Sequence, residues 1–313
     1  MKIKKTILTL LIIMLLIIIS LVITVIALSV QLQKEAADNN TLAAMAAANP
    51  REYIYPENTD VVTIKDSYLG EISIAALPNV PRAAYDYNNL KLESGRYKYV
   101  IDGITTSKTG VDVSSHNGDI NWEAVKDDGI DFAMIRLGYR GYGDGALNLD
   151  SEFYDNIKGA QAAGLDVGVY FYTQAVSEAE ALEEAEFVIQ ALIGYEITYP
   201  VAIDIEITEA EDVRANEVSG EMLTSVAEIF CKRIEEAEFK PMVYANIRMA
   251  YLKLDLRRLS KYDFWYAEYT DGFTAPQFYY DYQIWQYATD GRVNGIATDV
   301  DLNIAFENYV LTP

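Results

Sequence analysis

Cysteine and histidine are nearly absent from this chain of 313 residues, which has one of each, Cys231 and His116. A lone cysteine has no partner within the chain, so an intrachain disulfide is excluded and stability must come from a packed core. Without a second histidine or cysteine, neither a His/Cys metal site nor a nucleophile pair can be assembled around His116. Other residue types must therefore carry the chemistry.

Basic residues are also scarce, with 25 Lys and Arg against 47 Asp and Glu and a net charge of -22. Residues 1–105 hold ten of each sign, so the whole acidic excess lies in residues 106–313. Nucleic acids and anionic membrane surfaces bind basic patches, and neither is an expected partner of this acidic part. Such acidity is typical of a well-solvated surface and does not identify a substrate.

One long hydrophobic run is present near the N-terminus. Residues 6–30 contain no charged side chain and are long enough to cross a bilayer as one helix. Lys2, Lys4 and Lys5 precede the run, which keeps residues 1–5 in the cytoplasm and places the rest of the chain outside. A cleaved signal peptide is the alternative, because residues 43–46 resemble a cleavage region, but they lie far beyond the run. We favour an uncleaved anchor in the cell membrane.

Composition divides the rest of the chain into three parts. Residues 31–50 are rich in Ala and Asn, which is typical of a linker. In residues 51–108 tyrosines alternate with short apolar runs, which predicts a small β-rich spacer packed on, or tethered to, the main domain. Residues 109–313 form the main domain, and we expect a fragment that starts near Thr109 to fold without the spacer.

Strand-like and helix-like segments alternate from Gly110 onward. The strand-like segments are 110–114, 132–138, 165–173, 201–207, 241–246, 264–269, 283–287 and 298–302. The helix-like segments are 122–128, 151–163, 177–193, 220–238 and 249–259. This alternation predicts an α/β fold with a parallel sheet closed into an irregular (β/α) TIM-like barrel, with about eight strands and five helices. The last three strands are too close together for full helices between them.

Two carboxylates, Asp204 and Glu206, lie within the apolar segment 201–207. Alternation along a strand turns both to the same face, and two acids in one poorly solvated space acquire different pKa values. That arrangement is typical of glycosidases, although an amphipathic strand with a solvated polar face is an alternative. Asp112 and Asp301 could join them where the strands of a barrel end, or could simply cap turns.

Three groups of residues make the chain resemble the family 25 glycoside hydrolases, the lysozymes that act as N-acetylmuramidases. They are 110–114 with His116 and 120–122, the 202–206 strand, and 285–287 with Gly295 and 299–303. The resemblance covers about residues 109–309, and one departure is Asn121, where many members have Asp.

The resemblance implies a modified barrel that cleaves the β-1,4 bond between N-acetylmuramic acid and N-acetylglucosamine in peptidoglycan, without metal or cofactor. By position, Glu206 would be the general acid, and Asp204 would stabilise the oxocarbenium-like transition state or orient the substrate's 2-acetamido group. Both the covalent and the substrate-assisted route stay open. Asp112 and Asp301 would hold substrate and raise the proton affinity of the pair.

Aromatic side chains at strand ends are candidates for stacking on sugar rings. They are Tyr139, Tyr170, Tyr172, Tyr244, Trp265 and Trp285. The expected function is a membrane-anchored, outward-facing muramidase that acts on peptidoglycan glycan strands during cell-wall remodelling. The alternatives are a non-catalytic peptidoglycan-binding module of the same fold and a hydrolase of another β-linked amino sugar such as chitin.

Overall fold

Eight strands close into a barrel in the computed structural model, which describes residues 60–66, 70–208, 210, 213–269 and 274–306. The strands are β6 (Ser107–Val113), β7 (Phe132–Arg140), β9 (Asp166–Tyr172), β10 (Val201–Asp204), β11 (Pro241–Asn246), β12 (Asp263–Ala267), β13 (Ile284–Gly291) and β14 (Val300–Phe306). The barrel closes because β6 pairs with β14 on one side and with β7 on the other. A short strand, β8 (Leu147–Leu149), folds back onto the end of β7.

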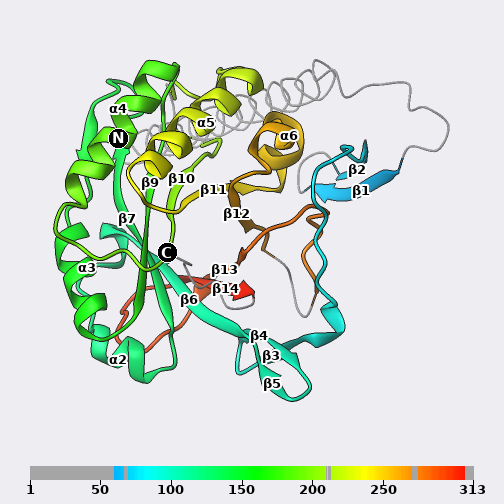
Figure 1. The fold of residues 1–313 in the computed structure, drawn as a ribbon. Coiled ribbons are helices and arrows are strands. Elements are labelled where there is room, and N and C mark those ends of the chain that lie inside the picture. The colour runs from blue at the N-terminus through cyan, green and yellow to red at the C-terminus, as the bar shows by residue number, and fades with distance from the viewer. Residues whose placement is uncertain (1–59, 67–69, 209, 211–212, 270–273, 307–313) are drawn as a thin grey trace, which may run out of the picture. The chain divides into compact units, whose positions relative to one another are not determined.

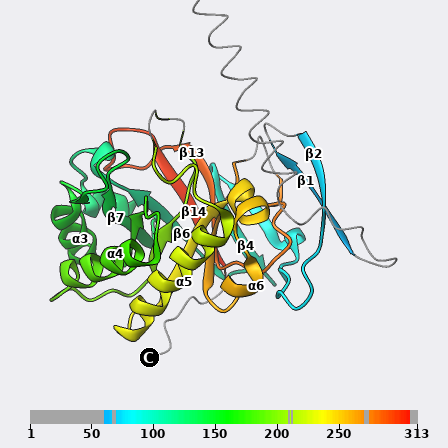
Figure 2. The same ribbon diagram turned by 90° about the horizontal axis from the view of Figure 1, so that it is seen from above.

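Helices cover one side of this barrel, where α3, α4 and α5 lie on the outer face of β7 to β11 (Figures 1 and 2). The α-helices are α2 (Trp122–Asp127), α3 (Phe153–Ala162), α4 (Glu178–Ala191), α5 (Gly220–Glu236) and α6 (Leu256–Leu259). The side chains of Asn121, Ser177 and Ser219 accept hydrogen bonds from the first turns of α2, α4 and α5, which fixes where these helices begin. The expected helix over 249–259 is divided instead, because Asp255 caps a new start after the π-helix Met249–Lys253.

The direction of β14 departs from the expected parallel sheet. β14 runs antiparallel to both β13 and β6, because the connection 292–299 is too short for the crossover that a parallel strand needs. The reversal brings the beginning of β14, rather than its end, to the mouth of the barrel. Asp301 therefore pairs in register with Asp112.

Large side chains fill the barrel interior, so it is a packed core below the mouth. Most of this buried cluster comes from the strands, and Tyr199 precedes β10; its members are Phe132, Met134, Tyr199, Ala202, Met242, Tyr244, Trp265, Ala267, Ile284 and Ala305. The strand β10 has four consecutive buried residues, which is typical of a strand covered on both faces.

The segment before β6 covers the side of the barrel formed by β13 and β14. It contains β3 (Leu90–Glu93), β4 (Arg96–Ile101) and β5 (Ile104–Thr105), which pair antiparallel. The Tyr97 ring, only 3% exposed, lies 4.8 Å from the Trp285 ring between centroids, and the Tyr99 ring lies 5.5 Å from that of Phe306. A boundary at residue 108 would thus separate these tyrosines from the side chains that bury them.

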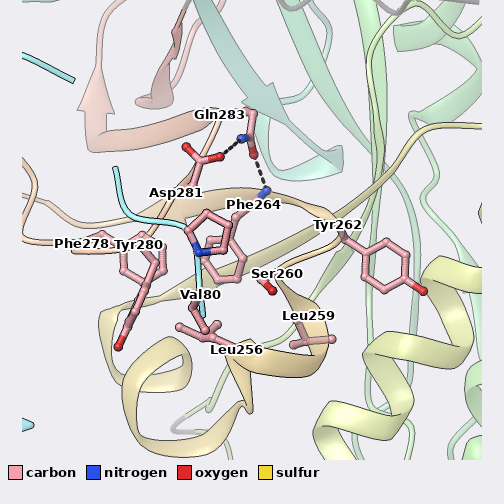
Figure 3. A pocket seen from close by; sticks show the side chains of 11 residues that line it. Val80, Leu256, Leu259, Ser260, Tyr262, Phe264, Phe278, Tyr280, Asp281 and Gln283 are labelled. Carbon is pink, nitrogen blue, oxygen red and sulfur yellow. Dashed lines mark hydrogen bonds between the residues drawn. The ribbon is translucent and has the colours of Figure 1, made fainter. Parts of the chain in front are cut away.

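A small apolar pocket lies where this segment meets α6 (Figure 3). Val80 faces Leu256, Leu259 and Phe264 across it. The side-chain amide of Gln283, beside the pocket, already has partners. Its oxygen accepts from the Phe264 backbone N–H at 2.8 Å, and its nitrogen donates to the exposed Asp281. The pocket is a packing crevice between two apolar surfaces.

Most of two further strands, residues 63–66 and 70–74, belong to a separate compact unit. They are β1 (Val61–Asp66) and β2 (Gly70–Ala75), which pair as a two-stranded sheet. Within the residues that the structure describes, no helix is both long and apolar enough to span a bilayer. The anchor expected at 6–30 and the linker at 31–50 lie outside the described residues.

Candidate active site

Four carboxyl groups meet at the mouth of the barrel. Asp112 is next to last in β6, Asp204 ends β10, Glu206 follows two residues later, and Asp301 is second in β14. All four line one cavity of about 140 Å³. Tyr170, Tyr244, Trp265, Tyr269 and Gln286 complete its wall.

Asp112 is held by two side-chain amides. Its Oδ2 accepts from Asn303 Nδ2 at 2.7 Å and from Gln286 Nε2 at 2.8 Å. Trp265 Nε1 donates to Asn303 Oδ1 at 2.8 Å, which turns the Asn303 amide nitrogen toward the acid. Because the group is buried, this support is what allows a charge at Asp112 to persist.

Asp301 retains its proton to higher pH than an ordinary aspartate, because it lies buried beside Asp112. Burial, the charge of Asp112 and a hydrogen bond to Asp112 together raise the pKa of Asp301 to about 9. Burial raises the pKa of Asp112 as well, although the hydrogen bonds that it makes with Asn303, Gln286 and Asp301 oppose the shift. The two carboxyl groups therefore titrate as a pair, and a negative charge on both at neutral pH is unfavourable.

Glu206 has the protonation behaviour of a general acid. Burial, with a further contribution from the charge of Asp112, raises the pKa of Glu206 to about 7, although a hydrogen bond from Tyr244 opposes the shift. Tyr244 Oη lies 3.2 Å from Glu206 Oε1 and 2.8 Å from Gln286 Oε1. Tyr269 also donates to Gln286 Oε1, at 2.7 Å, and these two phenols fix the amide orientation.

Asp204 lines the cavity, and one of its carboxylate oxygens accepts no hydrogen bond from the described residues. Its Oδ1 is buried and has no hydrogen-bond partner among the described residues. Burial, followed by the charges of Glu206 and Asp112, raises the pKa of Asp204 well above its ordinary value, while the positive charge of Arg136 opposes the shift. Asp204 and Glu206 thus compete for one proton. Arg136 is itself fixed by Asp150, at 2.8 Å from its Nε, and by Ser115, at 3.1 Å from its Nη2.

The candidate aromatic residues divide into two groups. Tyr170, Tyr244 and Trp265 line the cavity, whereas Tyr139, Tyr172 and Trp285 do not. Tyr139 lies farther out on β7, with the Arg136 guanidinium 5.5 Å from its ring.

Trp285 does not reach the cavity, which corrects the expectation that it contacts sugar. Its ring is fully buried against Tyr97, and its Nε1 donates to the Glu268 backbone oxygen at 2.9 Å. Alternation along β13 turns Trp285 and Gln286 to opposite faces, and Gln286 faces the acids.

The sequence reasoning missed several residues that build the site: Arg136, Tyr269, Gln286 and Asn303. One of them, Asn303, carried a usable signal, because it lies two positions after Asp301 on one strand and thus shares its face. No group of three or more His, Cys, Asp or Glu among the described residues is arranged to hold a metal ion.

Comparison with known proteins identifies the relatives of this barrel and its acids. The sequence profile of glycosyl hydrolases family 25 matches residues 111–296. The chain belongs to this family. The resemblance inferred from the motifs around Asp112, Asp204 and Asp301 is confirmed.

Among family 25 relatives, the autolytic lysozyme of Clostridium acetobutylicum is 27% identical over 194 residues, which cover 62% of this chain and 54% of that protein. The bacterial lysozyme from Streptomyces coelicolor has 26% identity and a TM-score of 0.53, with 63% of this chain and 90% of that chain covered. The modular autolysin LytC from Streptococcus pneumoniae was solved with a synthetic peptidoglycan ligand. It has 24% identity and a TM-score of 0.57, and the match covers 78% of this chain and 57% of that chain. This chain thus spans about half the length of the Clostridium relative.

Proposed function

We propose that this family 25 glycosyl hydrolase is a muramidase, which hydrolyses the β-1,4 bond between N-acetylmuramic acid and N-acetylglucosamine in peptidoglycan. The observation that carries the proposal is the pairing of Asp204 and Glu206 in one cavity. A carboxyl with a pKa of about 7 is a proton donor near neutral pH, and the unpaired Asp204 oxygen faces the same space.

Glu206 donates its proton to the glycosidic oxygen as the bond from that oxygen to the anomeric carbon breaks. The negative charge of Asp204 stabilises the positive charge that develops on the sugar ring. A water molecule then supplies hydroxyl to the anomeric carbon, and its remaining proton returns to Glu206. The overall change is hydrolysis, and the enzyme ends in its starting protonation state.

Asp112 and Asp301 add to the effect of burial on Glu206. Their shared proton leaves one negative charge in the cavity, and that charge raises the pKa of Glu206. The two amides on Asp112 prevent it from taking the proton of Glu206 instead, because they stabilise its charged form.

Three facts about relatives support peptidoglycan as the substrate. The chain is 27% identical over 194 residues to the autolytic lysozyme of Clostridium acetobutylicum. A structural neighbour is named a bacterial lysozyme, and another was solved with a synthetic peptidoglycan ligand. A chitinase would need the same acid pair, so the reaction product must discriminate between them.

We further propose that residues 6–30 anchor the enzyme in the cell membrane with the barrel outside. The uncharged run and the lysines at positions 2, 4 and 5 support this orientation. Tethering would confine hydrolysis to the wall above the membrane, which suits remodelling of the producer's own wall.

Digestion of purified peptidoglycan, followed by mass spectrometry of the new reducing ends, tests the reaction. We expect muramic acid at the reducing ends. Reducing N-acetylglucosamine, or cleavage of chitin oligosaccharides with intact peptidoglycan, would contradict the proposal. Binding to the wall with no new ends would indicate a non-catalytic module.

A further inference from the structure

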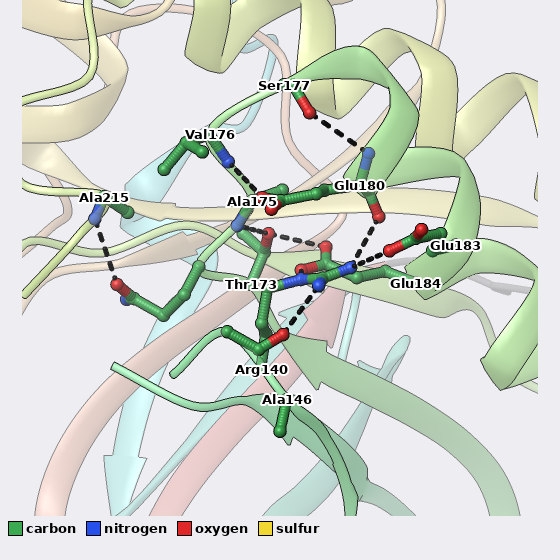
Figure 4. Close-up of polar contacts among 12 residues, drawn as sticks. Arg140, Ala146, Thr173, Ala175, Val176, Ser177, Glu180, Glu183, Glu184 and Ala215 are labelled. Atoms are coloured by element: carbon green, nitrogen blue, oxygen red, sulfur yellow. Dashed lines mark hydrogen bonds and ion pairs between the residues drawn. The ribbon is translucent and has the colours of Figure 1, made fainter. Parts of the chain in front are cut away.

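A charged pair that does not line the cavity of the four acids lies buried among polar contacts between β7 and α4 (Figure 4). Arg140, the last residue of β7, is 3% exposed, and Glu184 on α4 is fully buried. Arg140 Nε donates to Glu184 Oε1 at 2.7 Å. Desolvating two charges costs several kcal/mol per ion, roughly what their attraction and hydrogen bonds return, so such a pair is weak evidence for stability alone.

Glu184 connects α4 to the end of β10, the strand that carries Asp204, through Thr173. Glu184 Oε2 accepts from Thr173 Oγ1 at 2.6 Å, and the Thr173 backbone N–H donates to the Asp204 backbone oxygen at 3.1 Å. Movement of Glu184 would therefore be transmitted to the end of β10, where Asp204 lies.

Arg140 also holds the loop that follows its own strand. Its Nη1 donates to the Gly145 backbone oxygen at 2.7 Å, and its Nη2 donates to the Glu180 backbone oxygen at 2.9 Å. Gly145 has a φ of 67°, and a side chain there would collide with the guanidinium of Arg214. The positive φ is what favours glycine at this position, since the guanidinium is the mobile end of a side chain.

Arg214 links the loop after β10 to the start of α4. Its Nη2 donates to Glu180 Oε1 at 2.8 Å, while Glu180 Oε2 accepts from the Val176 backbone N–H at 2.8 Å. The Arg214 backbone N–H donates to the Tyr142 backbone oxygen at 3.2 Å. The loops after β7, β9 and β10 are therefore joined into one rim.

Two tyrosines lie at the end of these connections. The Tyr142 and Tyr172 rings meet edge to face, with centroids 6.0 Å apart and an interplanar angle of 89°. The Tyr172 hydroxyl accepts from Gln174 Nε2 at 3.2 Å, and Gln174 Oε1 accepts from the Ala215 backbone N–H. Tyr142 is 43% exposed, so its ring is available to solvent.

This pair is close to the acids. Tyr172, the last residue of β9, pairs in register with Asp204 on β10. A glycan strand bound across the acids extends beyond the cavity, which at about 140 Å³ is smaller than the roughly 300 Å³ lower bound of typical ligand pockets. Sugar rings outside the cavity therefore need contacts on the rim.

We propose that Tyr142 and Tyr172 form a sugar-binding subsite on this rim, and that Arg140, Glu184 and Arg214 are positioning residues for it. The ligand is a pyranose ring of the same β-linked glycan strand, next to the sugars at the cleaved bond. The subsite rests on the proposed function for its ligand. Aromatic rings bind the apolar faces of sugars, and a prearranged ring loses less freedom on binding than one on a loose loop.

The first experiment measures binding without turnover, in the full chain carrying Glu206→Gln. Adding Tyr142→Ala should raise the Kd for sedimented peptidoglycan sacculi by about 3- to 10-fold, which corresponds to the loss of one aromatic contact. Adding Tyr142→Phe should restore most of the affinity, because the ring is kept. Tyr154→Ala is the matched control, since Tyr154 is 40% exposed on α3, outside the rim loops, and it should leave the Kd unchanged.

The second experiment separates positioning from general stability. With Glu206 intact, Arg214→Ala should raise KM for long glycan strands more than KM for short fragments, with kcat little changed. In the Tyr142→Ala background the same substitution should have almost no further effect, because Arg214 acts through the tyrosine. Additive effects would mean that Arg214 serves the fold only and would overturn its role.

The outcomes distinguish the two proposals. An unchanged Kd for Tyr142→Ala overturns the subsite, whatever the hydrolysis assay shows. A wild-type protein that releases no reducing ends from peptidoglycan overturns the proposed function. The binding measurement still decides the subsite in that case, because it does not depend on turnover.

Discussion

Asp301 and Asp112 face each other in register on neighbouring antiparallel strands, and a hydrogen bond joins their carboxyl groups. The pairing depends on the reversed direction of β14, which brings the start of that strand to the mouth. Burial and mutual repulsion make two charges there unfavourable, so the pair takes up one proton that the unfolded chain would release.

Asp301→Asn should therefore change how stability depends on pH. The pKa of Asp301 is about 9 in the folded state and about 4 in an unfolded chain. Between these values the folded state binds more protons, so its stability falls as pH rises. Asparagine does not titrate and can still donate to Asp112. The variant's Tm should exceed that of the wild type at pH 8 and approach it near pH 4.

The matched control is Asp119→Asn at an exposed position. This substitution should leave the change in Tm between pH 4 and pH 8 the same as in the wild type. A Tm for Asp301→Asn that runs parallel to the wild type from pH 4 to 8 would show that Asp301 is ionised in the folded protein.

Activity should follow a bell-shaped pH profile with an alkaline limb near pH 7. The limb arises because Glu206, whose pKa is raised to about 7, must be protonated to act. The acid limb should lie above about pH 4, since the pKa of Asp204 is raised above its ordinary value and that group must be charged. Both limbs are properties of the coupled cluster. Activity that rises steadily from pH 7 to 9 would argue against Glu206 as the acid.

Tyr97→Ala should destabilise the barrel by about 3–5 kcal/mol, the usual cost of removing a large buried aromatic ring. Tyr97 packs on Trp285 and Tyr287, whose strand carries Gln286 to the active site. For the same reason a fragment that starts at Thr109 should melt well below one that starts at residue 76. Ile104→Ala, at a position that is 67% exposed, is the control and should leave Tm nearly unchanged. Equal melting of the two fragments would mean that the segment is only a tether.

Protease added to cells with permeable walls and intact membranes tests the proposed topology. We expect loss of the barrel and a short protected N-terminal fragment, because residues 6–30 would lie in the bilayer. Full protection of residues 110–313 would place the barrel inside the cell.

Local signals in the sequence predicted much of the barrel. Capping by Ser177 and Ser219 set the starts of α4 and α5, and alternation brought Asp204 and Glu206 to one cavity. Features that depend on contacts between distant parts of the chain could not be predicted from local signals. The direction of β14 depends on pairing with β6, and the Arg140–Glu184 contact joins residues 44 positions apart.

The orientation of β13 shows the same limit at the level of single residues. Alternation predicts that Trp285 and Gln286 face opposite sides, but only the closed barrel determines which side is inside. The large aromatic ring was the more conspicuous candidate for sugar binding. In the structure Gln286 contacts the acids, and Trp285 packs outward on the segment before β6.

Turnover of Glu206→Gln tests the central claim most directly. Glutamine keeps the size and hydrogen bonding of Glu206 but has no transferable proton, so kcat should fall by roughly 10² to 10⁴ with little change in wall binding. Asp204→Asn should also be severely impaired, whereas alanine at the exposed His116 should be milder than either. Near wild-type kcat for Glu206→Gln, or a loss that arises entirely from weaker binding or unfolding, would contradict the assignment of Glu206 as the proton donor.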